Sequence, residues 1–192
     1  MRLPKKTKRK RHLREPIGFA VLAIAVIGMA WLVFAPPQAT QTPPTSTSTR
    51  KLAPDFTLTG IWGEHVHLSD FHGKVVVLEF MRTTCPHCVN EMTELVALEH
   101  TANGITMISV TVDPEGDTVE VLERFIKNYG APYSSRTQWL FARDTADVTS
   151  LYGISSVPTI IIIDEDGYIV QVNTGEVELQ TLQQQIEAAQ AD

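Results

Sequence analysis

The two cysteines of this 192-residue chain stand three positions apart, as Cys85 and Cys88 in the segment Thr-Thr-Cys-Pro-His-Cys-Val-Asn. Thiols at this spacing can exchange a disulfide with a partner, can supply half of a metal site, or can form an inert structural disulfide. A structural zinc site needs four ligands, and the histidine between the cysteines would have to fold back onto the same ion. An inert disulfide would close a loop too short to restrain the unfolded chain. The spacing therefore favours a redox couple.

A helix that begins at the cysteines would give the two thiols different environments. Cys88 and the apolar residues after it recur at helical spacing, and Pro86 suits a first turn because its missing N–H needs no partner there. Cys85 then falls at the helix N-terminus, where free N–H groups and the helix dipole favour a thiolate, so we expect it to be the nucleophile. Cys88, one turn further and facing inward, is the expected resolving thiol. His87, if protonated, would add positive charge beside the thiolate, and the alternative is a side chain that points to solvent.

The apolar pattern of the remaining chain alternates between strands and helices. Short apolar runs bounded by turn residues predict strands, and apolar residues at helical spacing predict the helices between them. The predicted strands are 56–58, 66–68, 74–81, 105–112, 139–142, 158–163 and 168–172. The predicted helices begin near residues 86, 118, 146 and 179, with Asp117 or Thr118 as the N-cap of the second. This order predicts an α/β domain with a mixed central sheet flanked by helices.

Three motifs together resemble the thioredoxin fold. They are the Val75–Phe80 strand, the Cys-Pro-His-Cys segment, and Val157-Pro158-Thr159 at the start of a later strand. In thioredoxins the loop proline is cis and packs against the disulfide, which implies that Pro158 belongs to the site.

Two further segments narrow the resemblance. Ala53-Pro-Asp-Phe and the later Leu68-Ser-Asp-Phe-His-Gly-Lys are similar to segments of the membrane-anchored TlpA/ResA-like thiol-disulfide oxidoreductases, which share an AhpC/TSA-type scaffold. The resemblance covers Leu52 to about Gln185. It implies disulfide exchange with proteins through a redox-active Cys85–Cys88 disulfide, with no dissociable cofactor and no metal.

The resemblance also implies that two carboxylates lie near Cys85 and Cys88. Glu79 stands six residues before Cys85, where thioredoxins place a buried acid under the disulfide. Its apolar neighbours predict burial, which would raise its pKa and let it accept the proton of Cys88 near neutral pH. The alternative is an edge position that faces water. Glu91 matches an acid near the active site of ResA-like proteins and lies on a helix face adjacent to Cys88, a position that also suits a solvated surface.

Other features leave the direction of electron transfer and one alternative function open. Thr84 stands before the first cysteine, where thioredoxins usually have Trp. The Pro-His dipeptide resembles that of the strongly oxidising DsbA proteins, whereas TlpA/ResA-like proteins more often reduce, for example the cysteines of apocytochrome c before haem attachment. The segment 112–122 is similar to copper-handling Sco proteins, which use Cys-x-x-x-Cys and a histidine well downstream, but this chain has no histidine after His100. A Sco-like copper-binding assembly factor for a respiratory metalloenzyme is the alternative function.

The first fifty residues predict a membrane anchor. Residues 1–16 are a basic segment, and residues 17–35 are nineteen residues without a charge, enough to span a bilayer as a helix. A cleaved signal peptide is the rival, but Pro36-Pro37 makes a poor cleavage site. Residues 36–50 form a Pro-, Thr- and Ser-rich linker, and residues 51–192 the thioredoxin-like domain. The positive-inside bias predicts a single-pass protein of the cell membrane with its N-terminus in the cytoplasm and its domain outside.

The charge of the chain is divided between its two ends. Eight of the 16 Lys and Arg lie in the first fifteen residues, so the rest carries −13 while the whole chain carries −6. A surface that acidic disfavours nucleic acid. The expected partners are proteins with cysteines or disulfides and a membrane redox partner.

Overall fold

The computed structural model describes residues 50–129 and 139–191. The predicted basic segment 1–16, the predicted transmembrane helix 17–35 and, apart from Arg50, the predicted linker lie outside these residues. No helix in the described part is both long and apolar enough to cross a membrane.

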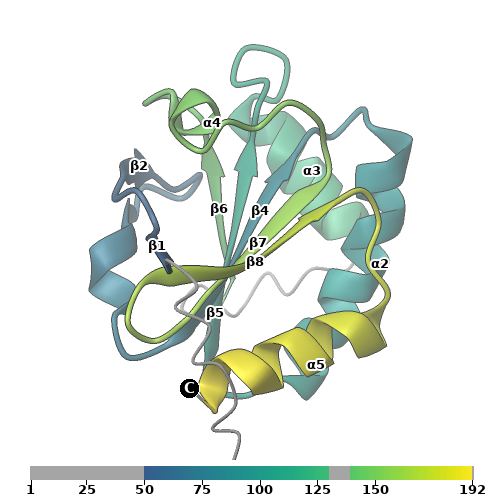
Figure 1. Cartoon of the computed structure of the whole chain (residues 1–192). Helices are drawn as coiled ribbons and strands as arrows, with labels where there is room; N and C mark the ends of the chain where they lie inside the picture. The colour runs from purple at the N-terminus through teal and green to yellow at the C-terminus, as the bar shows by residue number, and fades with distance from the viewer. Residues whose placement is uncertain (1–49, 130–138, 192) are drawn as a thin grey trace, which may run out of the picture. The chain divides into compact units, whose positions relative to one another are not determined.

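A six-stranded mixed sheet forms the centre of the domain (Figure 1). Its strands, in the order β1-β8-β7-β4-β5-β6, are β1 (Lys51–Leu52), β8 (Tyr168–Thr174), β7 (Thr159–Ile163), β4 (Val75–Met81), β5 (Ile105–Thr111) and β6 (Trp139–Arg143). β4, β5 and β6 are parallel, whereas β7, β8 and β1 pair antiparallel with their neighbours. The predicted mixed sheet is therefore confirmed. β4, β5 and β7 are buried along their whole length, as their predominantly apolar, β-branched sequences favour.

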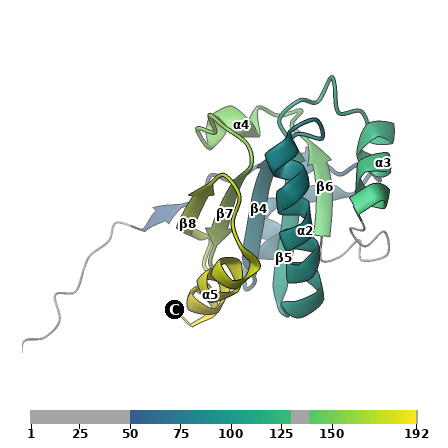
Figure 2. The ribbon, with the colours of Figure 1, turned by 90° about the vertical axis from the view of Figure 1, so that its right-hand side faces the viewer.

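Helices and a small second sheet cover the two faces. The helices are α2 (Pro86–Thr101), α3 (Val119–Tyr129), α4 (Val148–Leu151) and α5 (Leu179–Gln190), and a 3₁₀ turn, η1, spans Leu68–Phe71. α2, α3 and α5 pack on one face, where Leu95, Ile126 and Leu182 join one core cluster. β2 (Thr57–Thr59), β3 (His65–His67), η1 and α4 pack on the other face. Figure 2 shows α2 and α5 in front of the sheet.

The alternation of β4 decides which side chains face α2. Val75, Val77 and Met81 belong to the core under α2, α3 and α5, while Val76 and Phe80 belong to the core on the opposite face. Side chains two residues apart on a strand point to the same face. Glu79 therefore points toward the helix that carries the cysteines.

Most predicted elements occur within two residues of their expected bounds, and three details differ. The first predicted strand, 56–58, is Thr57–Thr59, and the predicted helix at 146 begins at Val148. At the start of α3, the Val121 N–H donates to Thr118 Oγ1 at 3.4 Å, so Thr118 rather than Asp117 occupies the cap. Asp117 is buried and makes other contacts, described below.

The chain enters the domain at the end of the sheet that is opposite the cysteines. Arg50 forms an ion pair with the buried Asp164, which follows β7, and its guanidinium lies 5.0 Å from the centre of the Tyr168 ring. Ile163, at this end of β7, pairs with Val76 at the start of β4, while the cysteines follow the other end of β4. The full length of β4 therefore separates the entry point from the thiols.

Candidate functional site

Cys85 is the N-cap residue of α2. The Cys88 backbone N–H donates to its Sγ atom at 3.2 Å, and its own N–H donates to the Arg82 carbonyl at 3.2 Å. Pro86 occupies the first turn, as predicted. The Sγ atom of Cys85 lies at the N-terminus of α2, which has sixteen residues. The N-terminus is the positive end of a helix dipole, a position that stabilises a thiolate. Cys85 is partly exposed and Cys88 is fully buried, so a partner can reach only the first sulfur directly.

The loop before β7 lies against Cys85 from the other side. The Cys85 thiol donates to the Val157 carbonyl, with 3.7 Å between sulfur and oxygen. The peptide bond between Val157 and Pro158 is cis, and Pro158 is buried. The structure thus brings Pro158 and its loop to the two cysteines, although Pro158 lies 70 or more residues after them along the chain.

Glu79 lies beneath the couple and is 1 % exposed, so the alternative of an edge position is wrong. Its Oε2 atom accepts a hydrogen bond from Ser109 Oγ at 2.5 Å, and Ser109 in turn accepts from Trp139 Nε1 at 2.9 Å. Its Oε1 atom has no partner among the described residues. Burial raises the pKa of Glu79 to about 8, partly offset by the Ser109 hydrogen bond.

Cys88 shares this low-dielectric environment. Burial is the main reason that its pKa is raised, and the hydrogen bond with Cys85 and the charge of Glu79 act in the same direction. Because Glu79 interacts electrostatically with Cys88 and titrates near neutral pH, it can take up the proton that the buried thiol must lose before it attacks.

Glu91 is buried rather than solvated. It lies three residues after Cys88 on α2, and the segment that precedes α5 covers it: the Val177 N–H donates to Glu91 Oε2 at 2.7 Å. Burial raises its pKa to about 7. The next turn repeats the contact, since the N–H of Leu179, the first residue of α5, donates to Glu94 Oε2 at 2.9 Å. Helical spacing alone could not reveal this cover, because it comes from residues more than 80 positions away.

His87 points to the surface, where it meets Glu176. Its Nδ1 atom lies 2.5 Å from Glu176 Oε1, which also accepts from Asn90 Nδ2 at 3.2 Å. The hydrogen bond with His87 lowers the pKa of Glu176, and that with Asn90 adds to the effect. The geometry therefore pairs the imidazole of His87 with a carboxylate at the surface.

We predict that Glu176→Gln makes the couple more oxidising, because it removes a negative charge from the groove beside Cys85 and so favours the thiolate. The pair is exposed, so the shift in the equilibrium constant with glutathione should be modest, about two- to threefold. His87→Ala should change that constant less in the wild-type chain than in the Glu176→Gln background. Equal effects of His87→Ala in both backgrounds would contradict the pairing.

Asp117 positions the loop before Cys85 and was not recognised as a site residue from the sequence. It is 1 % exposed and accepts hydrogen bonds from the Thr83 N–H at 3.1 Å and from the hydroxyls of Thr83 and Thr111. An Asp between a strand and a helix is ordinarily interpreted as a helix cap, so only the fold reveals that it holds Thr83.

Replacing Asp117 with Ala should lower the free energy of unfolding by about 2–3 kcal/mol, because three donors lose a buried acceptor. The rate of disulfide exchange should fall as well, since the chain before Cys85 loses its anchor. Urea unfolding and an exchange assay would measure the two effects. Asp113→Ala is a suitable control, because that side chain is 39 % exposed, pairs with Arg82 at 3.6 Å and accepts an exposed hydrogen bond from the Gly116 N–H at 3.0 Å. Its removal should change the unfolding free energy by less than about 1 kcal/mol.

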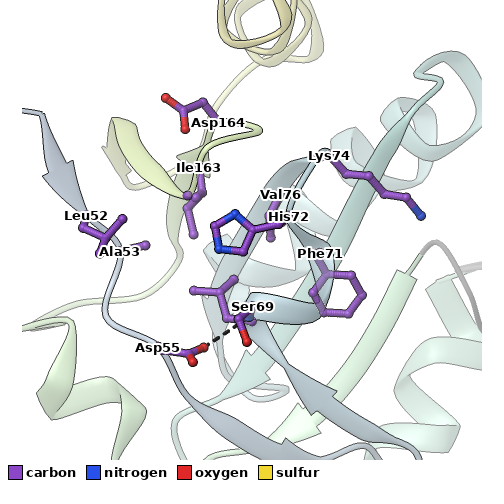
Figure 3. A pocket seen from close by; sticks show the side chains of 12 residues that line it. Leu52, Ala53, Asp55, Ser69, Phe71, His72, Lys74, Val76, Ile163 and Asp164 are labelled. Carbon is purple, nitrogen blue, oxygen red and sulfur yellow. Dashed lines mark hydrogen bonds between the residues drawn. The ribbon is translucent and has the colours of Figure 1, made fainter.

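A groove of about 380 Å³ lies beside Val157, the residue whose carbonyl accepts from the Cys85 thiol. We call it the active-site groove; it is lined by His87, Ser156, Val157, Pro158, Thr174, Gly175 and Glu176. A separate cavity of about 200 Å³ lies at the opposite end of the sheet, between Leu52, His72 and Gly167 (Figure 3). This cavity lies at the start of β4, away from the cysteines, and its Asp55 accepts from the Ser69 N–H at 3.2 Å. The first groove includes Val157, whose carbonyl accepts from the Cys85 thiol. The first groove is therefore the one beside the expected nucleophile. No group of three His, Cys, Asp or Glu within 50–129 and 139–191 is arranged to hold a metal ion.

Comparison with known proteins agrees with this geometry. The AhpC/TSA family model matches residues 49–172. The chain is 34 % identical to the thiol-disulfide oxidoreductase ResA of Halalkalibacterium halodurans, over 64 % of this chain and 66 % of that protein. It is 30 % identical to ResA of Bacillus subtilis, over 88 % of each.

A solved structure shows the same fold. The crystal structure of a thiol:disulfide interchange protein, DsbE, from Chlorobium tepidum matches with a TM-score of 0.60 and 28 % identity, covering 73 % of this chain and 96 % of that one. These similarities do not support the copper-delivery alternative. The chain belongs to the AhpC/TSA family and is a thioredoxin-like thiol-disulfide oxidoreductase of the ResA type.

Proposed function

We propose that this protein exchanges disulfides with cysteine-containing client proteins through Cys85 and Cys88, and that no dissociable cofactor takes part. One observation carries the proposal: a partly exposed sulfur caps a helix, and a buried thiol one turn away lies over an acid whose pKa is near neutral. This arrangement separates an accessible nucleophile from a protected resolving group.

In the reducing direction, the exchange takes place in two successive attacks of sulfur on a disulfide. The Cys85 thiolate attacks one sulfur of a client disulfide, a Cys85–client disulfide forms, and the departing client sulfur takes a proton from water. The Cys88 thiol then passes its proton to Glu79, and its sulfur attacks Cys85 and displaces the second client sulfur as a thiolate. Two electrons reach the client, and the protein is left with a Cys85–Cys88 disulfide. Oxidation of a client dithiol runs through the same steps in reverse.

The reduced full-length chain should reduce insulin catalytically when a dithiol regenerates it, with turbidity of the released B chain as the measurement. Cys85→Ala should abolish the activity. Failure of the wild-type chain to form a disulfide with any protein thiol would overturn the proposal.

The direction of exchange depends on the redox potential. Equilibration with glutathione measures this potential. A value near about −120 mV would favour an oxidase, and a value below about −270 mV would favour a reductase. A redox potential below about −270 mV would support the proposal that the client is a protein whose cysteines must be kept reduced, such as apocytochrome c before haem attachment.

We also propose that residues 17–35 anchor the protein in the cell membrane, with the domain on the outer side and a membrane protein as redox partner. The uncharged nineteen-residue segment and the eight basic residues before it support this orientation. A membrane-impermeant thiol reagent applied to intact cells should label Cys85. Labelling only after lysis would contradict the proposed side.

A further inference from the structure

The active-site groove continues along the outer edge of the sheet. A second groove, of about 160 Å³, has Ile161, Val172 and Thr174 among the strand residues that line it, together with Lys51 of β1, and the loop 152–155 as its wall. We call it the edge groove. Thr174 lines both grooves, and Ser155 of the edge groove is followed directly by Ser156 of the active-site groove. The two grooves are therefore adjacent at Thr174 and at the 155–156 segment.

The strand beside the edge groove has one incompletely covered side. β8 pairs with β7 along its length, from Thr174 to Ile169. On its other side β1 pairs only with Tyr168 and Ile169, so residues 170–174 meet no further strand within the described part of the chain. Five residues of strand correspond to about 16 Å, enough for a short extended peptide.

This edge lacks most of the features with which proteins protect an exposed strand. Charged side chains, proline, a β-bulge or a very short strand normally hinder pairing with another chain. Of these, β8 has a register shift against β7 between Ile169 and Gln171, at the start of the edge. Residues 170–174 are Val, Gln, Val, Asn and Thr, with neither a charge nor a proline. Val172 is 52 % exposed, although it is apolar. An uncharged strand with an exposed apolar side chain is suited to receive an added strand.

We propose that the 170–174 edge of β8 is a docking surface for the client polypeptide. An extended segment next to the client cysteine adds to β8 as a strand, and one of its apolar side chains enters the edge groove against Val172. The adjacency of the two grooves at Thr174 selects the client over other occupants, because a segment docked there leads directly to Cys85. This inference rests on the proposed function and narrows the substrate class to unfolded or extended segments.

The test compares two disulfide peptides as substrates of the reduced full-length chain in detergent micelles. Both carry one cysteine in a mixed disulfide with a chromophoric thiol. The long peptide has about six uncharged, β-favouring residues on each side of the cysteine, and the short peptide has one. The measured quantity is the ratio of their second-order rate constants, in which any effect on the thiol chemistry cancels.

In the wild-type chain the long peptide should react about tenfold faster, which corresponds to about two net hydrogen bonds. Val172→Lys should reduce the ratio to about two or less, because it places a charge on the edge. Leu151→Lys is the matched control: Leu151 is 49 % exposed and lines neither groove, so the ratio should stay at the wild-type value. Methylating alternate backbone nitrogens of the long peptide should remove its advantage even with the wild-type chain.

Equal rates for both peptides would overturn the docking surface and leave the proposed function intact. Absence of exchange with either peptide would overturn both. The long peptide could react faster than the short one only after residues 40–49 are replaced by a Gly-Ser sequence. That result would show that the chain's own linker occupies the edge, against the proposal. If the chain self-associates and Val172→Lys abolishes the association, the edge of β8 binds a second copy of the chain. That result would also contradict the proposal.

Discussion

Replacing Cys88 with Ala should turn a transient mixed disulfide into a product that accumulates. Cys85 keeps its position at the start of α2 and can still attack a client, but no buried thiol remains to displace that client. We expect catalytic turnover to fall by a factor of about a thousand or more, because regeneration depends on thiols from solution. The measurement is a covalent adduct of chain and client on a non-reducing gel, with its mass confirmed by spectrometry and its loss on adding dithiothreitol.

Cys85→Ala is the matched control for this experiment. It leaves the buried thiol in place, and because Cys88 is fully covered, we expect no adduct. If the Cys85→Ala chain captured clients as efficiently as the Cys88→Ala chain, the assignment of nucleophile and resolving thiol would be wrong.

Replacing Glu79 with Gln should remove a large part of the pH dependence of stability. The pKa of Glu79 is about 8 in the folded chain and about 4.5 when exposed, so the folded state holds its proton more tightly. Between these values the free energy of unfolding falls as pH rises, because the unfolded state releases the proton first. Above about pH 8 the wild-type chain bears the full cost of a buried carboxylate, on the order of 3–5 kcal/mol. Gln has no such cost, so the variant should gain stability relative to wild type as pH rises.

Urea unfolding at about pH 5, 7 and 9 measures this difference. Glu91, whose pKa is also raised, is present in both chains, so only its interaction with Glu79, which raises the pKa of Glu79 further, differs between them. The same variant should slow the resolving step, about ten- to a hundredfold if Glu79 accepts the proton of Cys88. Parallel pH profiles of stability for wild type and variant would show that the pKa of Glu79 is not raised, and an unchanged rate of the resolving step would exclude it as that base.

The sequence patterns predicted the parts of the domain that depend on neighbouring residues. The apolar run of β4 predicted a buried strand, and the position of Pro86 predicted where α2 begins. Both follow from the period of a strand or a helix, which is a local property. The place of Glu79 under the cysteines was instead implied by the resemblance to thioredoxins.

Long-range contacts could not be predicted in this way. Glu91 is covered by Val177, His87 meets Glu176, and Asp117 holds Thr83, and in each case the partners lie 34 or more residues apart. A polar residue at a helix surface or strand end looks the same in the sequence whether the fold later covers it or leaves it in water. Only the packing of the β8–α5 segment across α2 distinguishes the two outcomes for Glu91.

The contact of Arg50 with Asp164 has a practical consequence for handling the protein. Any group attached upstream of Arg50 joins the domain at one end of β4, and seven residues of strand, about 20 Å, separate that end from the reactive sulfur. A bead, a fluorophore or a solid support coupled there leaves the catalytic face uncovered. Immobilised in this orientation, the domain can capture its partners from a mixture for identification.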